Sequence, residues 1–226
     1  MRERNLSLKI ILPLLGILLV QPLLLQPLYA EKAEYEIGVV GLISTYTKVD
    51  AKGSSNTGRV GPGFGPSGGF VLGQAMGARG RWGGEFHYVY FKNDFEPDGG
   101  GESLKFGAQS HAVHYDVLYY LTNKDSRVRP YVAAGFGVKA YQGTGEELPF
   151  QPLTDLALLT KGSHTLPTGA FGAGVKIKMG DNMFFRIEFR DYISGIPRKV
   201  ITPAPGATID GIYHHLAPFF GITWIF

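Results

Sequence analysis

Apolar and polar residues alternate at every second position over much of the chain, which is the pattern of strands with one buried face. In residues 183–190 the apolar face carries Phe185, Ile187 and Phe189, and the opposite, ionic face carries Arg186, Glu188 and Arg190. Alternation and turn residues together predict eight strands. Their ranges are 35–45, 68–76, 81–91, 106–121, 128–141, 165–179, 183–192 and 212–226.

The connectors between these strands are sorted by length. Long connectors (46–67, 92–105, 142–164 and 193–211) alternate with short ones (77–80, 122–127 and 180–182). Barrels of the bacterial outer membrane have short periplasmic turns and long extracellular loops, whereas nothing distinguishes the two ends of a soluble meander. The long connectors are polar and rich in Gly, so we expect them to be flexible surface linkers.

Composition is compatible with a single barrel domain of either a soluble or a membrane kind. Hydrophobic residues make up 44% of the 226 residues, and the mean hydropathy is +0.01. These values are typical of a soluble protein. A membrane barrel would give the same average, because its lipid-facing residues alternate with polar ones. The 32 Gly, 12 Tyr and 15 Phe favour a barrel with aromatic girdles. The chain contains no Cys, which excludes disulfides, a thiolate metal site and a lipoprotein anchor.

Residues 1–30 have the three parts of a secretory signal peptide. Basic Arg2, Arg4 and Lys9 precede an apolar stretch over 10–25, and a small residue, Ala30, marks the expected cleavage site. A membrane anchor is the alternative, but Pro and Gln interrupt a segment that is already shorter than the roughly 20 apolar residues of a span. We therefore assign 1–30 to a signal peptide and 31–226 to one barrel domain.

Charge gives no support to nucleic-acid binding. The whole chain carries +3, and residues 1–30 hold three basic residues and one acidic residue, so that 3 − 1 = +2 belongs to the signal. The remaining 3 − 2 = +1 leaves residues 31–226 nearly neutral, without the concentrated basic surface that nucleic acids require.

Three short motifs resemble one known family. Gly221, Trp224 and the final Phe226 fill the places of the C-terminal signal that the barrel-assembly machinery recognises. Residues 129–137 (RPYVAAGFG) and 185–192 (FRIEFRDY) are similar to neighbouring strands of the OmpA-like outer-membrane β-barrel family. The resemblance implies an eight-stranded antiparallel up-and-down transmembrane β-barrel in the outer membrane of a Gram-negative bacterium.

The same resemblance implies the partners. They are outer-membrane lipid, lipopolysaccharide, the barrel-assembly machinery and periplasmic chaperones, with the chain itself a monomer. It implies a structural or surface-interaction role, in which the extracellular loops contact any partner. The anchoring role of longer family members is not carried over, because we expect no peptidoglycan-binding domain after the last strand. We expect no cofactor.

If the apolar faces point to lipid, a set of mixed charges points into the lumen. An eight-stranded barrel is just filled by side chains, so these groups would pair with one another and form a plug rather than a gated ion path. The predicted ion-pair network consists of Glu36, Glu85, His87, His114, Asp116, Lys139, Lys176, Arg186, Glu188 and Arg190. His215 belongs to the same face.

Three alternatives remain: a lipid A-modifying enzyme, a small pore and a soluble lipocalin-like barrel. Ser110–His111 and Ser163–His164 supply catalytic residue types, but not the His-x-Ser arrangement of the deacylases, so we predict no enzyme. His214 and His215 would point to opposite faces of a strand and cannot share a metal ion, so we predict no metal site. The aromatic faces, such as Phe86 with Tyr88 and Tyr90, disfavour a soluble barrel.

Overall fold

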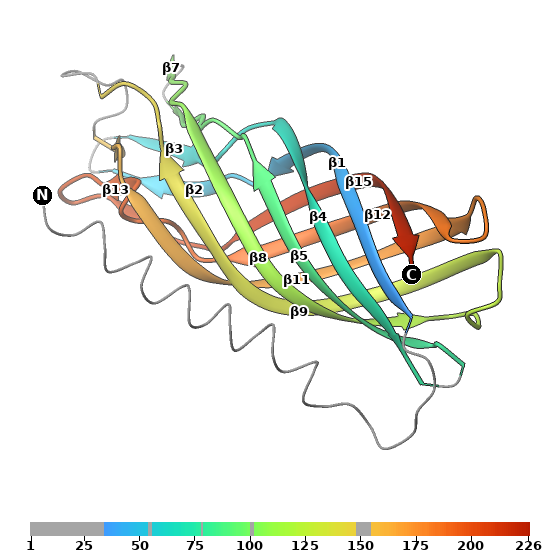
Figure 1. Cartoon of the computed structure of the whole chain (residues 1–226). Coiled ribbons are helices and arrows are strands. Elements are labelled where there is room, and N and C mark those ends of the chain that lie inside the picture. Colours follow the sequence, from blue (N-terminus) through green and yellow to red (C-terminus); the bar gives the residue numbers. More distant parts are fainter. Residues whose placement is uncertain (1–33, 54–55, 78, 100–101, 148–154) are drawn as a thin grey trace, which may run out of the picture. The chain divides into compact units, whose positions relative to one another are not determined.

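The protein forms a closed eight-stranded barrel in a computed structural model, which describes residues 34–226 apart from 54–55, 78, 100–101 and 148–154 (Figure 1). The predicted signal peptide, with its expected cleavage site at Ala30, lies outside the described residues. The barrel strands are β1 (Tyr35–Tyr46), β4 (Gly65–Met76), β5 (Trp82–Phe91), β8 (Ala108–Tyr120), β9 (Val128–Gly143), β11 (Ser163–Lys178), β12 (Met183–Ser194) and β15 (Tyr213–Ile225). Each pairs antiparallel with its neighbours along the chain, and β1 pairs with β15 to close the sheet.

The eight-stranded prediction is confirmed. The largest difference in a strand boundary is at β4, which begins at Gly65 rather than at Gly68. The face of this strand, which the sequence left open, is now assigned: Val71 is buried, whereas Phe70 is 58% and Leu72 44% exposed on the outside. The described residues include no helix with the length and hydropathy of a membrane span.

Inward-facing glycines on β9 and β11 make room for large side chains in the lumen. A Cβ atom on Gly174 would lie 2.5 Å from the Tyr131 hydroxyl and 2.8 Å from the Glu188 Cβ. A Cβ atom on Gly135 would collide with the Asp116 carboxylate. The alternating glycines of these strands are therefore required by the size of the polar side chains that lie over them.

The described parts of the long connectors contain paired strands, which corrects the prediction of flexible linkers for these parts. Three of them form a five-stranded sheet in the order β14 (Thr208–Ile209), β2 (Val49–Lys52), β3 (Thr57–Val60), β6 (Asp98–Gly99) and β7 (Glu102–Ser103). A separate two-stranded sheet pairs β10 (Ala157–Leu159) with β13 (Ile201–Pro203). We call these seven short strands, together with the other described residues of the four long connectors, the cap.

A hydrophobic core explains why the cap folds. Val60, Phe95, Leu156 and Ile201 come from four different connectors and are almost fully buried together. Their cluster continues onto the inward-facing Tyr46, Tyr141 and Tyr213 at the end of the barrel. Each connector alone is too polar to fold, but the four together bury enough apolar surface to offset the entropy of ordering.

Candidate functional site

The predicted lumen residues lie on the inner faces of strands spread around the barrel. Glu36 comes from β1, Glu85 and His87 from β5, His114 and Asp116 from β8, Lys139 from β9, Lys176 from β11, and Arg186, Glu188 and Arg190 from β12. All except Glu36 are buried, and the Glu36 side chain is 10% exposed. They are brought together because their strands present every second residue to one small interior.

Lys176 occupies the end of this interior that lies nearer the short turns. Its Nζ atom donates to Glu36 Oε2 at 2.6 Å, to Glu85 Oε1 at 2.8 Å and to the Tyr120 hydroxyl at 2.8 Å. Three acceptors satisfy the three donors of an ammonium group, so that the buried lysine is fully hydrogen-bonded.

Two arginines occupy the middle of the interior and share one carboxylate. Glu188 Oε2 accepts from Arg186 Nη2 at 2.9 Å, from Arg190 Nη2 at 3.2 Å and from the Tyr131 hydroxyl at 2.7 Å. Arg186 also binds both oxygens of Glu85, at 3.2 and 2.7 Å, in the two-pronged geometry that is the strongest for this pair. The arrangement links β5 and β12, which are not neighbours in the sheet.

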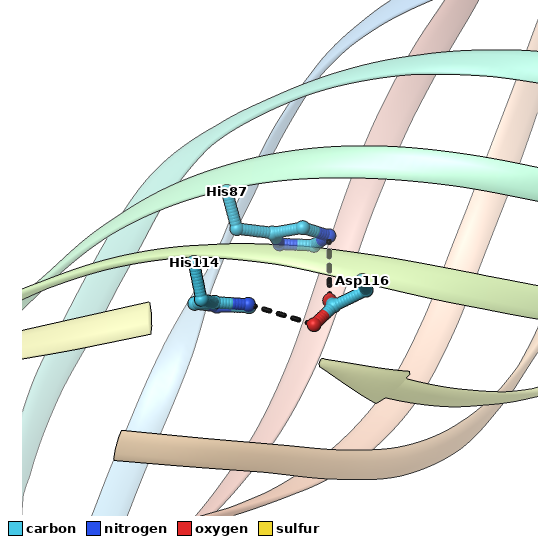
Figure 2. A group of neighbouring side chains, drawn as sticks. All are labelled: His87, His114 and Asp116. Carbon is cyan, nitrogen blue, oxygen red and sulfur yellow. Dashed lines mark hydrogen bonds and ion pairs between the residues drawn. The ribbon is translucent and has the colours of Figure 1, made fainter. Parts of the chain in front are cut away.

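His87, His114 and Asp116 form the group that has metal-ligand residue types, and Figure 2 shows both imidazoles directed at the Asp116 carboxylate. His114 Nδ1 lies 2.8 Å from one carboxylate oxygen and His87 Nε2 lies 3.5 Å from the other. Arg190 is also bonded to Asp116, and its Nη2 lies 3.2 Å from His87 Nε2. A guanidinium therefore already supplies positive charge at this point, and a metal ion would have to displace it.

The charges of this cluster nearly balance. Glu36, Glu85, Asp116 and Glu188 contribute −4, and Lys176, Arg186 and Arg190 contribute +3, so that −4 + 3 = −1. The imidazoles of His87 and His114 lie stacked at 4.8 Å beside these groups. A balanced, mutually bonded set is the condition under which buried charges are tolerated.

Lys139 departs from the predicted network. Among the described residues no carboxylate lies within ion-pair distance of its Nζ, which instead contacts His215 Nδ1. The Nζ lies 4.3 Å from the ring centre of Phe91 and 4.8 Å from that of Tyr46. Lys139 is thus held by aromatic faces and an imidazole, at the end of the lumen under the cap.

Several inward-facing residues were missed by the sequence analysis. Tyr120 and Tyr131 bind the charged cluster, and Arg129 stacks on Tyr120 at 4.0 Å and donates to the Gly80 carbonyl at 2.6 Å. A signal was present, because Tyr131 follows Arg129 by two residues and so shares its face. A cavity of about 10 Å³ beside Arg129, lined by Glu36, Glu85 and Tyr120, has room for about one water molecule.

The Ser–His neighbours do not form catalytic pairs. Ser110 points inward and contacts the Tyr46 hydroxyl, whereas His111 points outward and contacts the Tyr88 hydroxyl. Ser163 and His164 follow each other on β11 and so also point to opposite faces. His214 and His215 diverge as predicted, with His214 paired on the outside to Asp191 at 2.7 Å.

Gly221 and Trp224 of the C-terminal motif lie on β15 where it meets β1, and Phe226 directly follows this strand. Trp224 is 43% and Phe226 75% exposed, and Phe226 stacks on Tyr35 with ring centres 6.3 Å apart. Gly221 faces Val39 and Val40 so closely that a Cβ atom there would lie 2.5 Å from the Val39 carbonyl oxygen. Recognition of these residues by the assembly machinery stays a prediction.

A closed eight-stranded sheet with an apolar exterior and a polar, filled interior defines an integral protein of the outer membrane of a Gram-negative bacterium. The chain belongs to the family described as outer membrane protein beta-barrel domain, whose model matches residues 12–209. The comparison with curated proteins gives no match.

Several solved structures share this fold. Neisserial surface protein A is 15% identical, with a TM-score of 0.51, and covers 87% of this chain and 100% of its own. OprG from Pseudomonas aeruginosa is 13% identical, with a TM-score of 0.51, over 86% of this chain and 95% of its own. A major outer membrane protein from Thermus thermophilus is 14% identical, with a TM-score of 0.50, over 87% and 100%. These likenesses show the fold.

Proposed function

We propose that this protein is a monomeric structural and surface-interaction protein of the outer membrane, with a closed lumen and no enzymatic activity. The observation that carries the proposal is the filling of the interior by a bonded set of buried charges, above which lie the aromatic residues around Lys139 and then the cap. A barrel of about eight strands leaves little interior space beyond its side chains.

The surface-interaction part of the proposal is supported by the folded cap. A sheet that carries its own hydrophobic core holds its exposed side chains in fixed positions, which lowers the entropy cost of binding a partner. Flexible linkers would offer no such surface. The outward-facing polar side chains of the cap, such as Arg59 and Lys105, are the groups that a partner would meet first.

Planar-bilayer recording tests the closed lumen. Purified, refolded protein should insert without producing stepwise currents, and robust unitary conductance would contradict the plug and favour the small pore. A porin recorded in the same bilayers is the positive control.

Mass spectrometry of lipid A tests the absence of catalysis. Spectra from cells with and without the protein should be identical, because the Ser–His neighbours point to opposite faces of their strands. A deacylated or additionally acylated species that depends on the protein would establish the enzyme alternative instead.

A further inference from the structure

Basic side chains gather on three neighbouring turns at one end of the barrel. The turns connect β4 to β5, β8 to β9 and β11 to β12. The first two turns are neighbours because β5 pairs with β8, and the last two are neighbours because β9 pairs with β11. They therefore follow one another along the same rim. Their basic residues are Arg79, Arg81, Lys124, Arg127 and Lys178. We call this set the basic rim.

Backbone contacts between the turns fix the basic rim as a unit. The Lys124 amide donates to the Arg79 carbonyl at 3.1 Å, and the Lys178 amide donates to the Arg127 carbonyl at 2.8 Å. The Arg81 Nε atom donates to the Asn123 side chain at 3.2 Å. The spacing of the charges is thus set by the sheet, and the side chains do not have to be gathered from a flexible loop.

The charge of the chain is polarised toward this rim. Residues 77–81, 121–127 and 178–182 hold five basic and two acidic residues, so that 5 − 2 = +3. The whole of residues 31–226 carries +1, so everything outside the three turns carries 1 − 3 = −2. Asp125 and Asp181 are the two acidic residues on the turns, and Glu34 lies on the far side of β4, beside Ala75.

The level of the basic rim relative to the membrane follows from its apolar neighbours. Trp82, Leu121, Val128 and Met179 adjoin the charged residues and are between 46% and 57% exposed on the outside of the barrel. Trp82 also packs against Tyr119, with ring centres 5.0 Å apart and ring planes tilted by 59°, as in an interfacial aromatic girdle. The basic side chains therefore lie at the headgroup level of the periplasmic leaflet.

We propose that the basic rim is a binding site for the phosphates of anionic phospholipids in the periplasmic leaflet. Guanidinium and ammonium groups bind phosphate through charge-assisted hydrogen bonds, and each basic group near a lipid surface favours an anionic lipid by about fivefold. The cell wall is the competing source of negative charge on this side. The turns are only a few residues long and stay beside lipid-facing residues, which places the charges within the bilayer surface rather than beyond it.

Trp82 provides a reporter within the site. The chain has two tryptophans, and Trp224→Phe leaves Trp82, beside Arg79 and Arg81, as the single tryptophan, which can be excited selectively over the tyrosines. The refolded barrel is placed in phosphatidylcholine vesicles that contain either brominated phosphatidylglycerol or brominated phosphatidylcholine, and Trp82 quenching is measured against the mole fraction of the brominated lipid. Because Arg79 and Arg81 both lie beside Trp82, we expect the phosphatidylglycerol to be enriched there by at least about fivefold.

The variant Arg79→Gln with Arg81→Gln should bring this enrichment close to one, and about 0.5 M NaCl should weaken it in the parent. Lys161→Gln with Lys199→Gln, at the opposite end of the barrel, is the matched control and should retain the preference. Heat-modified gel mobility confirms that each variant is folded.

Two results would overturn the proposal. One is equal quenching by the two brominated lipids in the parent, or a preference that survives loss of Arg79 and Arg81. The other combines two observations: the parent shows no lipid preference, and the parent co-sediments with purified peptidoglycan whereas the double variant does not. This result would assign the basic rim to the cell wall.

Discussion

Glu188 is the residue on which both buried arginines of β12 depend. Its Oε2 atom accepts from Arg186, Arg190 and Tyr131, all within 3.2 Å. Glu188→Gln removes the charge and leaves two guanidinium groups short of a partner, so we expect a loss of about 3–5 kcal/mol in the free energy of unfolding. Urea unfolding of the refolded barrel, followed by gel mobility, measures it. The exposed Asp50→Asn should unfold as the parent does.

Gly174 leaves space in the lumen for the side chains of Tyr131 and Glu188. Gly174→Ala would place a methyl group 2.5 Å from the Tyr131 hydroxyl and 2.8 Å from the Glu188 Cβ, both inside the packed lumen. We expect a loss of about 1–3 kcal/mol in the free energy of unfolding, as for other overpacked interiors. Gly180→Ala is the control, because no atom lies within 4 Å of its Cβ position. Equal stability of the two variants would show that Tyr131 and Glu188 can shift to accept the methyl group without a loss of packing.

At the scale of elements, one carboxylate joins side chains from three parts of the cap. Asp98 accepts from Lys48 at 2.9 Å and from Arg59 at 3.3 Å, and the hydrogen bond from Lys48 holds the pKa of Asp98 below its usual value. A lowered folded pKa means that the stabilisation is complete above the unfolded pKa of about 4 and is lost as the pH falls through the folded one.

Hydrogen exchange measures this loss. Protection factors of the β2 and β3 amides, corrected for intrinsic exchange, should fall in the parent as the pH is lowered below about 4. In Asp98→Asn they should already be reduced above pH 4, by the roughly 0.2–1 kcal/mol that an exposed ion pair contributes, and should change little with acid. A parent whose protection is constant over this range would show that Lys48 and Arg59 do not stabilise the sheet through Asp98.

The core of the cap makes a separate prediction. Phe95 lies between Pro62 and Phe106, to which it is bridged through its backbone. Its side chain is 1% exposed within the core of the cap, so Phe95→Ala should destabilise the cap by about 3–5 kcal/mol. Trypsin added to intact cells should then cleave the connectors faster, while the barrel keeps its heat-modified mobility. Phe64→Ala is the control because Phe64 is 65% exposed, and its cleavage rate should match that of the parent.

The sequence predicts the barrel strands well and the cap poorly, for a physical reason. Strands such as β12 alternate over many residues, so the period is visible in the sequence. Strands of the cap are two to four residues long, and their pairing joins distant connectors, as in Thr208 with Lys52. Alternation placed Glu85 and Arg186 in the lumen, but their bonding to each other follows from the closure of the barrel, which no local pattern encodes.

At the scale of the whole molecule, two layers stand between the solvent on the cap side and the periplasm. The cap rests on Tyr46, Tyr141 and Tyr213, and the charged cluster lies further in, across β1, β5, β8, β11 and β12. The layers share no ion pair among the described residues, since the ion pairs of the cap join Lys48, Arg59, Lys92 and Lys105 to Asp94, Glu96 and Asp98. Each layer should therefore be removable without opening the other.

Shortening the cap tests which layer seals the barrel. A variant with residues 48–61 replaced by a short Gly-Ser linker loses β2 and β3, and with them the centre of the five-stranded sheet. We expect it to remain without unitary conductance in planar bilayers, because Arg186, Arg190 and Lys176 still bridge the interior to Glu85, Asp116 and Glu36. Stepwise currents from this variant, with none from the parent, would instead make the cap the gate and would reduce the charged cluster to a lining that ions can pass.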